Sequence, residues 1–311
     1  MMETLTTIIP VYNGEKYITA TLESVAAQAR RPDRLIVLDN CSTDSTRKIA
    51  SEFKKIHCEL IQNPSNLGLF GNLNRALEFA DQTTFLHLLH ADDLILPKFY
   101  ETSAQALKVS SNRGLVYSLP ELVDDTGQRF LSGQLRSRST SRSLPPHRFI
   151  AERAELRPIY FVGVLLKTDS QPCPCKFRED MPQIADHVFW AEWARHCSQV
   201  IQLPETLTQY RFHTEAGTAR NINQLEPWVV DEWRAMQAIA ALLDEGSLRK
   251  QIRRQKLKAL FAARSLVKAS QVQSSSPELA AKIRAAARHV AGSLGYAAAG
   301  TAVRLRNFVS L

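Results

Sequence analysis

The chain has 311 residues, of which 44% are hydrophobic and 23% are charged, so it can bury a large core as one or two domains and does not have the composition of a disordered protein. No run approaches the roughly 18 apolar residues that a membrane-spanning helix needs. The first residues lead straight into a strand-like run, with no signal-peptide pattern, and the number of cysteines is odd, at five. We therefore expect reduced thiols and a cytoplasmic protein.

Four short apolar runs occupy the first hundred residues, at 5–11, 35–38, 59–62 and 85–89. Between them, apolar residues recur at helical spacing, as Ile18, Leu22 and Val25 do, and Asn13 is the expected cap of the helix that these three define. Fully apolar strands that alternate with helices predict an α/β fold, with a Rossmann-like, mostly parallel sheet and helices on both faces. Ligands of such sheets bind beyond the carboxyl ends of the strands. Polar residues follow the runs at these ends: Asn13, Asp39, Asn66, Asp92 and Asp93.

The fourth run ends in two adjacent carboxylates, Asp92 and Asp93. Two carboxylates that are held together repel one another unless a cation lies beside them. Mg²⁺ and Mn²⁺ are oxygen-seeking cations that proteins commonly share with substrate phosphates. The pair therefore predicts a metal-dependent site for a phosphorylated, nucleotide-linked substrate. The alternative is an exposed turn that caps the next helix.

The middle of the chain is less regular. Strand-like runs are predicted at 114–119, 159–166, 200–203 and 207–212, and a helix at 186–193. Residues 132–146 are rich in Ser, Arg and Pro, which predicts a mobile loop. From residue 228 onward the pattern is helical, with one break at 274–277.

The last part of the chain is strongly basic. Residues 247–311 hold 13 Lys and Arg residues against one acid, a net charge of +12, and because the whole chain carries +8, the other residues carry −4. A basic helical region suggests an anionic partner, either a membrane surface or nucleic acid. An apolar stripe runs beside arginines in this region, at Ile252, Leu260, Ala263 and Val267. It fits docking on anionic lipid and, equally, a solvated bundle or an oligomer contact.

Six short motifs follow one another along residues 4–215: TIIPVYNG at 7–14, VLDNCSTD at 37–44, NLG at 66–68, HADD at 90–93, AD at 185–186 and YRFH at 210–213. Together they resemble the family-2 glycosyltransferases of the GT-A fold. The resemblance implies a metal-dependent, inverting transfer of a sugar from a nucleotide-diphosphate donor, with UDP favoured, to an acceptor hydroxyl. It also implies Mn²⁺ or Mg²⁺ as the cofactor, a saccharide or lipid-linked acceptor, and a role in cell-surface, polysaccharide or glycolipid biosynthesis.

With this resemblance we expect three parts, in which 1–105 binds the nucleotide sugar, 106–220 binds the acceptor and 221–311 is a basic helical region. The implied nucleotide-binding residues are Pro10, Val11, Tyr12, Asn13, Asp39, Asn66, Gly68, Arg75 and Asp92. Asp39 would accept a hydrogen bond from the base, with a helix cap as the alternative. Asn40 departs from the family pattern by replacing an acid. Leu73 stands where the family often has an arginine that binds the diphosphate. The charge of the diphosphate would then be neutralised by Arg75, by another basic residue or by the metal alone.

The metal ligands are also carried over from the resemblance. Asp93 is the implied direct ligand, with Asp92 on the ribose or in the water shell of the metal. His90 replaces the first acid of the common motif and can bind a transition metal, contact the ribose or simply pack; we favour a ribose or structural role. Arg211 and His213 are implied to lie over the phosphates.

An inverting transfer needs one carboxylate that takes the proton of the acceptor hydroxyl. We expect Asp186, at the start of the 186–193 helix, to be this general base. An ordinary helix cap is the alternative role, and Glu179 and Asp180 are the nearby competitors.

Other functions stay open at this point. The changes at His90 and Leu73 would fit a sugar-nucleotide binder without catalysis. The basic tail would fit a nucleic-acid-binding protein, although it lacks a recognised motif and interleaved aromatic residues. A nucleotidyltransferase would need a glycine-rich, basic phosphate loop after the first strand, and residues 10–14 do not provide one.

Overall fold

The computed structural model describes residues 3–129, 140–213 and 224–309. The chain divides into two compact units. Unit 1 comprises residues 1–149, 158–179 and 192–213, and unit 2 comprises residues 150–157, 180–191 and 214–311. The division into three functional parts stays a prediction.

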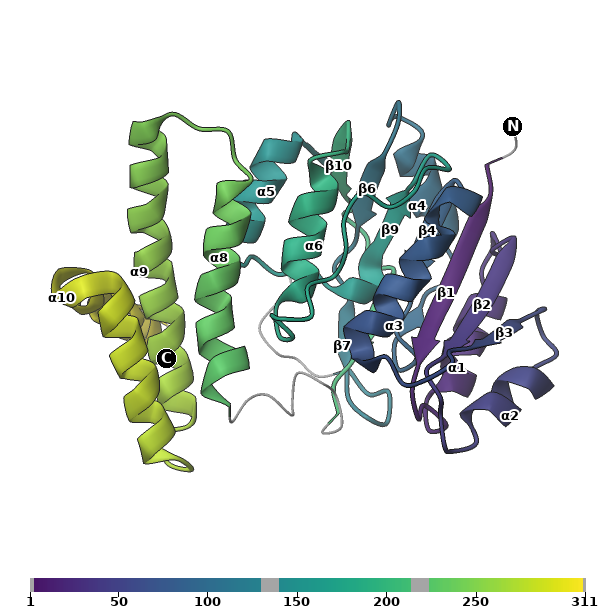
Figure 1. Cartoon of the computed structure of the whole chain (residues 1–311), viewed down its shortest axis with the longest axis horizontal. Helices are drawn as coiled ribbons and strands as arrows, with labels where there is room; N and C mark the ends of the chain where they lie inside the picture. The colour runs from purple at the N-terminus through teal and green to yellow at the C-terminus, as the bar shows by residue number, and fades with distance from the viewer. Residues whose placement is uncertain (1–2, 130–139, 214–223, 310–311) are drawn as a thin grey trace. The chain divides into compact units, whose positions relative to one another are not determined.

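Unit 1 is built on an eight-stranded sheet with the strand order β3-β2-β1-β4-β9-β6-β10-β8. Its strands are β1 (Leu5–Val11), β2 (Arg34–Asp39), β3 (Glu59–Gln62), β4 (Phe85–Leu88), β6 (Gly114–Tyr117), β8 (Arg142–Leu144), β9 (Val164–Lys167) and β10 (Gln199–Gln202). The first four neighbours pair in parallel, as do β6 and β10, whereas β9 and β8 pair antiparallel with their neighbours. The predicted α/β class with a mostly parallel sheet is confirmed (Figure 1).

The order of the first four strands creates a place for a ligand. The chain steps from β1 to β2 to β3 and then returns to the other side of β1 with β4. At such a reversal the connections leave in opposite directions, and a crevice opens beyond the carboxyl ends of the two central strands. The loops after β1 and β4 therefore border the predicted binding crevice. β1 is buried along its whole length, which fixes these loops on a rigid base.

Helices connect the strands of unit 1. They are α1 (Ile18–Ala26), α2 (Thr46–Glu52), α3 (Gly68–Ala76), the 3₁₀ helix η1 (Leu77–Gln82), α4 (Phe99–Leu107) and the 3₁₀ turn η2 (Phe161–Gly163). In α1 the helical spacing of apolar residues places one face of the helix in the core. Ile18, Leu22 and Val25 on this face are fully buried beside β1.

A small second sheet brings together three distant segments, in the order β5-β11-β7. These strands are β5 (Leu94–Ile95), β7 (Glu121–Val123) and β11 (Thr208–Arg211). β11 pairs antiparallel with β5 and parallel with β7. Because β5 directly follows Asp92 and Asp93, this sheet sets the position of the acidic pair.

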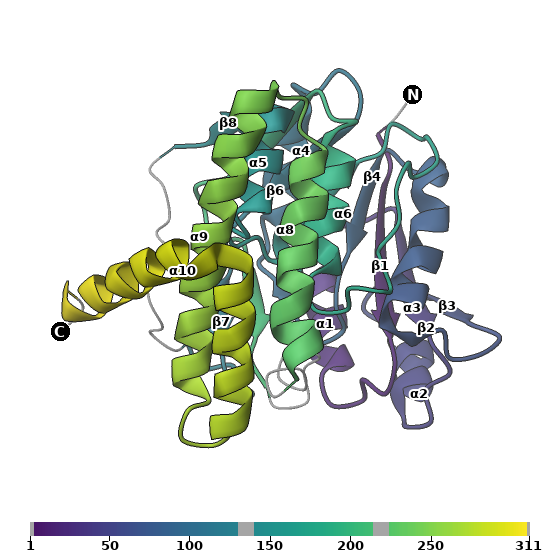
Figure 2. The ribbon, with the colours of Figure 1, turned by 60° about the vertical axis from the view of Figure 1, so that its left-hand side comes forward.

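Unit 2 is helical. Its main elements are η3 (Glu226–Val230), α8 (Asp231–Ala241), α9 (Ser247–Gln271) and α10 (Pro277–Val309), while α5 (Pro146–Ala154) and α6 (Ala185–Ala194) each have residues in both units. Helix α10 packs on α9 and changes direction at Gly292, whose φ of 70° favours glycine (Figure 2). Among the helices of the described residues, none has a stretch that is apolar enough, over a sufficient length, to cross a membrane.

Four sequence predictions need correction. The C-terminal helical region has a second break, at 242–246, between α8 and α9. Residues 142–144 form the edge strand β8 rather than part of a loop; the rest of that predicted loop lies partly in 130–139, outside the described residues. The strand predicted at 159–166 is a 3₁₀ turn at Phe161–Gly163 followed by β9. Helix α1 begins after Tyr17, so Asn13 does not cap it.

Candidate active site

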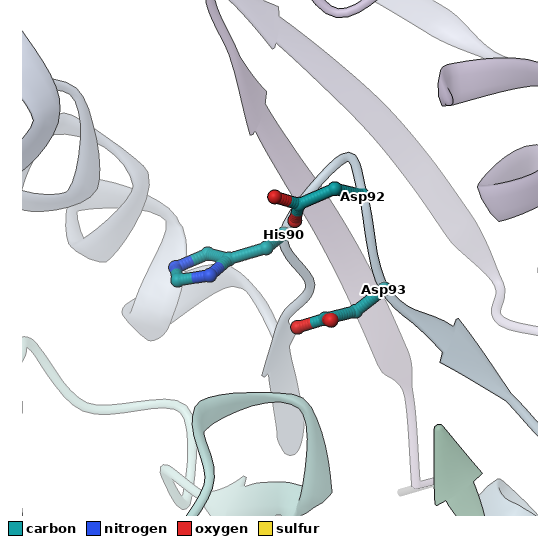
Figure 3. Close-up of side chains that lie close together, drawn as sticks. All are labelled: His90, Asp92 and Asp93. Carbon is teal, nitrogen blue, oxygen red and sulfur yellow. The ribbon is translucent and has the colours of Figure 1, made fainter. Parts of the chain in front are cut away.

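The loop after β4 carries three potential metal ligands, His90, Asp92 and Asp93 (Figure 3). A turn closes between the Asp93 N–H and the His90 carbonyl, at 3.3 Å. The Thr21 hydroxyl donates to the carbonyls of Ala91 and Asp93, at 2.8 and 3.0 Å, and so ties the loop to α1. The loop is therefore held from both sides, by α1 and by the second sheet.

The ligand atoms of the three side chains all lie within 4.8 Å of one another. Figure 3 shows the side chains projecting to the same side of the loop. Asp93 is only 1% exposed; its Oδ1 accepts a hydrogen bond of 3.0 Å from the Arg211 N–H, and its buried Oδ2 has no partner among the described residues. A buried, unpartnered carboxylate oxygen is costly unless something else satisfies it. A divalent cation fits this donor set.

The two carboxyl groups differ in acidity. Burial raises the pKa of Asp93 well above its usual range, and the charge of Asp92 raises it further. Burial opposes the ionisation of Asp92 as well, yet the hydrogen bond from His213 is the main cause that keeps its pKa below the usual value. The loop by itself thus makes Asp92 the easier of the two carboxyl groups to ionise. A cation beside both would favour ionisation of both.

His90 lies against the ring of Phe161, with ring centroids 4.2 Å apart and planes inclined by 18°. Its Nε2 is buried and has no hydrogen-bond partner in the part of the chain that the structure describes. Burial lowers the pKa of His90, so the ring is neutral near pH 7. Neutral imidazole is the form that binds metals.

Arg211 and His213 both contact the acidic loop. The Arg211 guanidinium donates to the carbonyls of Asp92, at 3.0 Å, and Asp125, at 3.1 Å, and so joins the loop to the turn after β7. The His213 Nε2 lies 2.9 Å from Oδ2 of Asp92. The structure therefore gives Arg211 a role in positioning the loop, and the phosphate contacts predicted for both residues stay predictions.

Polar groups at the ends of β1 and β2 lie at the sheet edge where the binding crevice is predicted. Asp39 is fully buried, and its carboxylate accepts the Ser42 N–H at 3.2 Å. Asn13, with a positive φ of 51°, accepts the Thr43 N–H through its side-chain oxygen at 2.8 Å. The first bond shapes the loop after β2, and the second joins that loop to the one after β1. This arrangement fits the predicted nucleotide site and also the alternative, structural role of Asp39.

The amide of Asn40 builds the adjoining turn. Its Nδ2 donates to Oδ1 of Asn66, at 2.8 Å, and to the carbonyl of Gly68, at 3.1 Å. Its Oδ1 accepts from the Asn63 amide and the Leu67 N–H, each at 2.9 Å. Gly68 has a φ of 72°, so this turn needs a glycine. Asn40 therefore supports Asn66 and Gly68 structurally, a role that an acid could not fill because it has no donor.

The remaining predicted residues lie as follows. Pro10 and Val11 end β1, and the Tyr12 side chain after them is half exposed. Leu73 is buried in the core, whereas Arg75 forms a surface ion pair with Glu78 at 3.2 Å. The predicted diphosphate contact of Arg75 is not tested by this arrangement.

Asp186 belongs to unit 2, in the first turn of α6. Burial raises its pKa to about 6, although the hydrogen bond from the His187 N–H, at 2.7 Å, and the charge of Arg153 lower it. The aromatic residues that follow it, Phe189 and Trp190, are buried as predicted. A fixed carboxyl group with a pKa near neutrality has the properties of a general base.

Several residues around the site carried no signal in the sequence. Tyr17 and Lys16 both hydrogen-bond to Asp125, and the Tyr17 ring lies 4.8 Å from the His213 ring. Phe161 supports His90 from a segment 71 positions away. Only the fold brings these positions together.

The sheet, its point of reversal and the His–Asp–Asp group at that point define an α/β protein with a candidate divalent-metal site. The family model described as "Glycosyl transferase family 2" matches residues 6–162, about half of the chain. The chain belongs to glycosyl transferase family 2, a family of sugar-transferring enzymes.

The relatives agree with this assignment. An uncharacterised glycosyltransferase of Haemophilus influenzae is 25% identical over 210 residues, which cover 66% of this chain and 64% of the relative, just under two thirds of its length. Among solved structures, residues 1–349 of Staphylococcus aureus TarS in complex with UDP-GlcNAc have a TM-score of 0.66 at 19% identity, covering 94% of this chain and 82% of that 1–349 chain. The mannosyltransferase PcManGT from Pyrobaculum calidifontis, in complex with GDP-Man and Mn²⁺, has a TM-score of 0.57 at 17% identity, covering 98% of this chain and 81% of the PcManGT chain. These structures share the fold of this chain.

Proposed function

We propose that the protein transfers a sugar, with inversion, from a nucleotide-diphosphate donor to an acceptor hydroxyl. The observation that carries the proposal is the group of His90, Asp92 and Asp93 at the reversal point of the sheet, with a buried Asp93 oxygen that lacks a partner among the described residues. The family assignment and the two ligand-bound structural neighbours support a nucleotide-sugar donor.

In this proposal Asp93 and Asp92 would hold Mn²⁺ or Mg²⁺. When bound, the cation would supply Lewis-acid stabilisation of the negative charge that develops on the leaving nucleotide. Asp39 and Asn13 border the base, and Arg211 keeps the acidic loop in place through its backbone contacts. Asp186 takes the proton of the acceptor hydroxyl as its oxygen attacks the anomeric carbon.

A thermal-denaturation screen tests the donor class. UDP, GDP, CDP and dTDP are each added with Mn²⁺ and, separately, with EDTA. A nucleotide at 100 times its Kd stabilises a protein by about 2.7 kcal/mol, so we expect the melting temperature to rise with one of the nucleotides, UDP foremost, only when Mn²⁺ is present. An equal rise in EDTA would contradict the metal-dependent site, and no rise with any nucleotide would contradict the donor class.

We also propose that the start of α9 docks on an anionic membrane, which would suit a lipid-linked acceptor. Leu248 and Ile252 are one helical turn apart and are 69% and 61% exposed. Arg249 lies beside them, one turn before Ile252, and forms no ion pair within the described ranges, and residues 247–311 as a whole carry a net charge of +12. Exposed apolar side chains in a strongly basic helical region are typical of helices that bind the surface of anionic bilayers. Of the stripe predicted from the sequence, Ile252 and Val267 are exposed, whereas the buried face of α9 carries Leu257 and Phe261 instead.

Liposome flotation tests this docking. We expect the protein to float with vesicles that contain phosphatidylserine and to remain behind with phosphatidylcholine alone. The double substitution Leu248→Ser and Ile252→Ser should reduce recovery by about tenfold or more, since each lost apolar group weakens burial by about 1 kcal/mol or more. Val109→Ser is the control, because Val109 is 63% exposed but lies in unit 1. Equal recovery of all three proteins would contradict docking through α9.

A further inference from the structure

The most unusual feature of the candidate metal site is the imidazole at position 90. We propose that His90 is a direct metal ligand and makes this site select Mn²⁺ and other transition-metal ions over Mg²⁺. The inference rests on the proposed function, because it assigns a cation to the same site. It replaces the ribose or structural role that the sequence favoured for His90.

The position of the ring supports ligation. A ring nitrogen of His90 lies within 4.8 Å of an oxygen of Asp92 and of Asp93, so one ion can reach all three. Two buried atoms of this group, Nε2 of His90 and Oδ2 of Asp93, lack hydrogen-bond partners among the described residues. Stacking on Phe161 fixes the plane of the ring without using its nitrogens. The ring is thus oriented by packing and its polar edge is left for a ligand.

A second histidine in the same segment shows how a structural histidine differs from His90. His87, three residues earlier in β4, is fully buried, and both of its nitrogens are engaged: Nδ1 with the Tyr100 hydroxyl at 2.9 Å and Nε2 with the Val162 carbonyl at 3.1 Å. This is the pattern of a structural histidine, whose polar atoms the fold satisfies. By contrast, the buried Nε2 of His90 has no hydrogen-bond partner among the described residues.

The donor set explains the selectivity. Mg²⁺ is bound through oxygen and tolerates little departure from octahedral geometry, whereas imidazole nitrogen suits first-row transition metals. Two carboxylates and one imidazole therefore favour Mn²⁺ relative to a site made of carboxylates alone. The His213 hydrogen bond to Asp92, at 2.9 Å, holds one of the carboxylates in orientation.

Pulsed electron paramagnetic resonance tests this directly. The full-length protein is loaded with Mn²⁺, with UDP or GDP present, and examined for ¹⁴N modulation from a coordinated imidazole. We expect the modulation in the wild type and in His213→Gln, and its loss in His90→Asp. His213→Gln is the matched control, because His213 is the other imidazole beside Asp92.

Competition between Mn²⁺ and Mg²⁺ gives a second readout. We expect His90→Asp to reduce the preference for Mn²⁺ by about 10- to 100-fold, the range typical of changes in the surroundings of a bound metal. Unchanged melting of metal-free His90→Asp would show that the variant is folded. Retention of the ¹⁴N modulation in His90→Asp, or an unchanged Mn²⁺ preference, would overturn the proposal while leaving the metal site intact. Failure of the wild type to bind either ion would contradict the proposed metal site itself.

Discussion

The substitution Asp93→Asn is expected to reduce kcat by about 100- to 1,000-fold, the cost of removing one group that stabilises developing charge. Asparagine keeps an oxygen that can accept the Arg211 N–H, but it removes the negative charge from the most buried ligand of the site. The loss should remain at saturating Mn²⁺, because the leaving nucleotide is no longer balanced by a correctly held cation. Turnover of a labelled sugar nucleotide measures it.

The fold of the variant must be checked separately. Burial already raises the pKa of Asp93, so replacing its carboxyl group with a neutral amide should not lower the melting temperature of the metal-free protein. Wild-type turnover by Asp93→Asn in saturating metal would rule out the assignment of Asp93 as a metal ligand.

The substitution Asp186→Asn should have the second large effect, a loss of about 100- to 10,000-fold in kcat, the range for general acid–base catalysis. A base must be ionised to accept a proton, and the pKa of Asp186 is about 6. We therefore expect the wild-type rate to fall as the pH drops below about 6, and this acidic limb to be absent from the residual activity of the variant. Asp180→Asn is the control, since Asp180 is half exposed and pairs with Arg234 in the same unit.

The Asp186→Asn variant should also be more stable than the wild type near neutral pH. The pKa of Asp186 is raised by folding, so its ionisation costs stability as the pH rises from about 4 to 6, and the full cost is present above that range. A shift of about two units corresponds to roughly 1–3 kcal/mol for a partly buried group. Urea denaturation at pH 7.5 should show this gain, and denaturation at pH 4 should show almost none. A variant that is inactive and also less stable at pH 7.5 would point to a structural role.

The sheet could be predicted from the sequence because its central strands are buried on both faces. Leu5–Val11 and Arg34–Asp39 show this as apolar runs that end in polar residues, and those ends mark the edge at which ligands bind. The edge strand Arg142–Leu144 gave no such signal. It is held by backbone pairing with β10, which requires no apolar pattern.

The site could be predicted only in part. Asp92 and Asp93 are neighbours in the chain, so their proximity is visible in the sequence. The contacts of Arg211 with Asp92 and Asp125, and of His90 with Phe161, join segments that are far apart. The Arg211 contacts depend on the register of β11 between β5 and β7, and the His90 contact depends on the pairing of β4 with β9; local sequence patterns determine neither.

The amide of Asn40 places a constraint on how this chain can diverge. Its two donated hydrogen bonds end on the side chain of Asn66 and on the carbonyl of Gly68, and it is 1% exposed. A carboxylate introduced at position 40 would face two acceptors and have no water with which to compensate. Positions 40 and 66 are therefore expected to be coupled: an acid at position 40 requires the Asn66 amide to turn its Nδ2 toward that acid, which breaks the hydrogen bond that Oδ1 of Asn66 accepts from the Gly68 N–H.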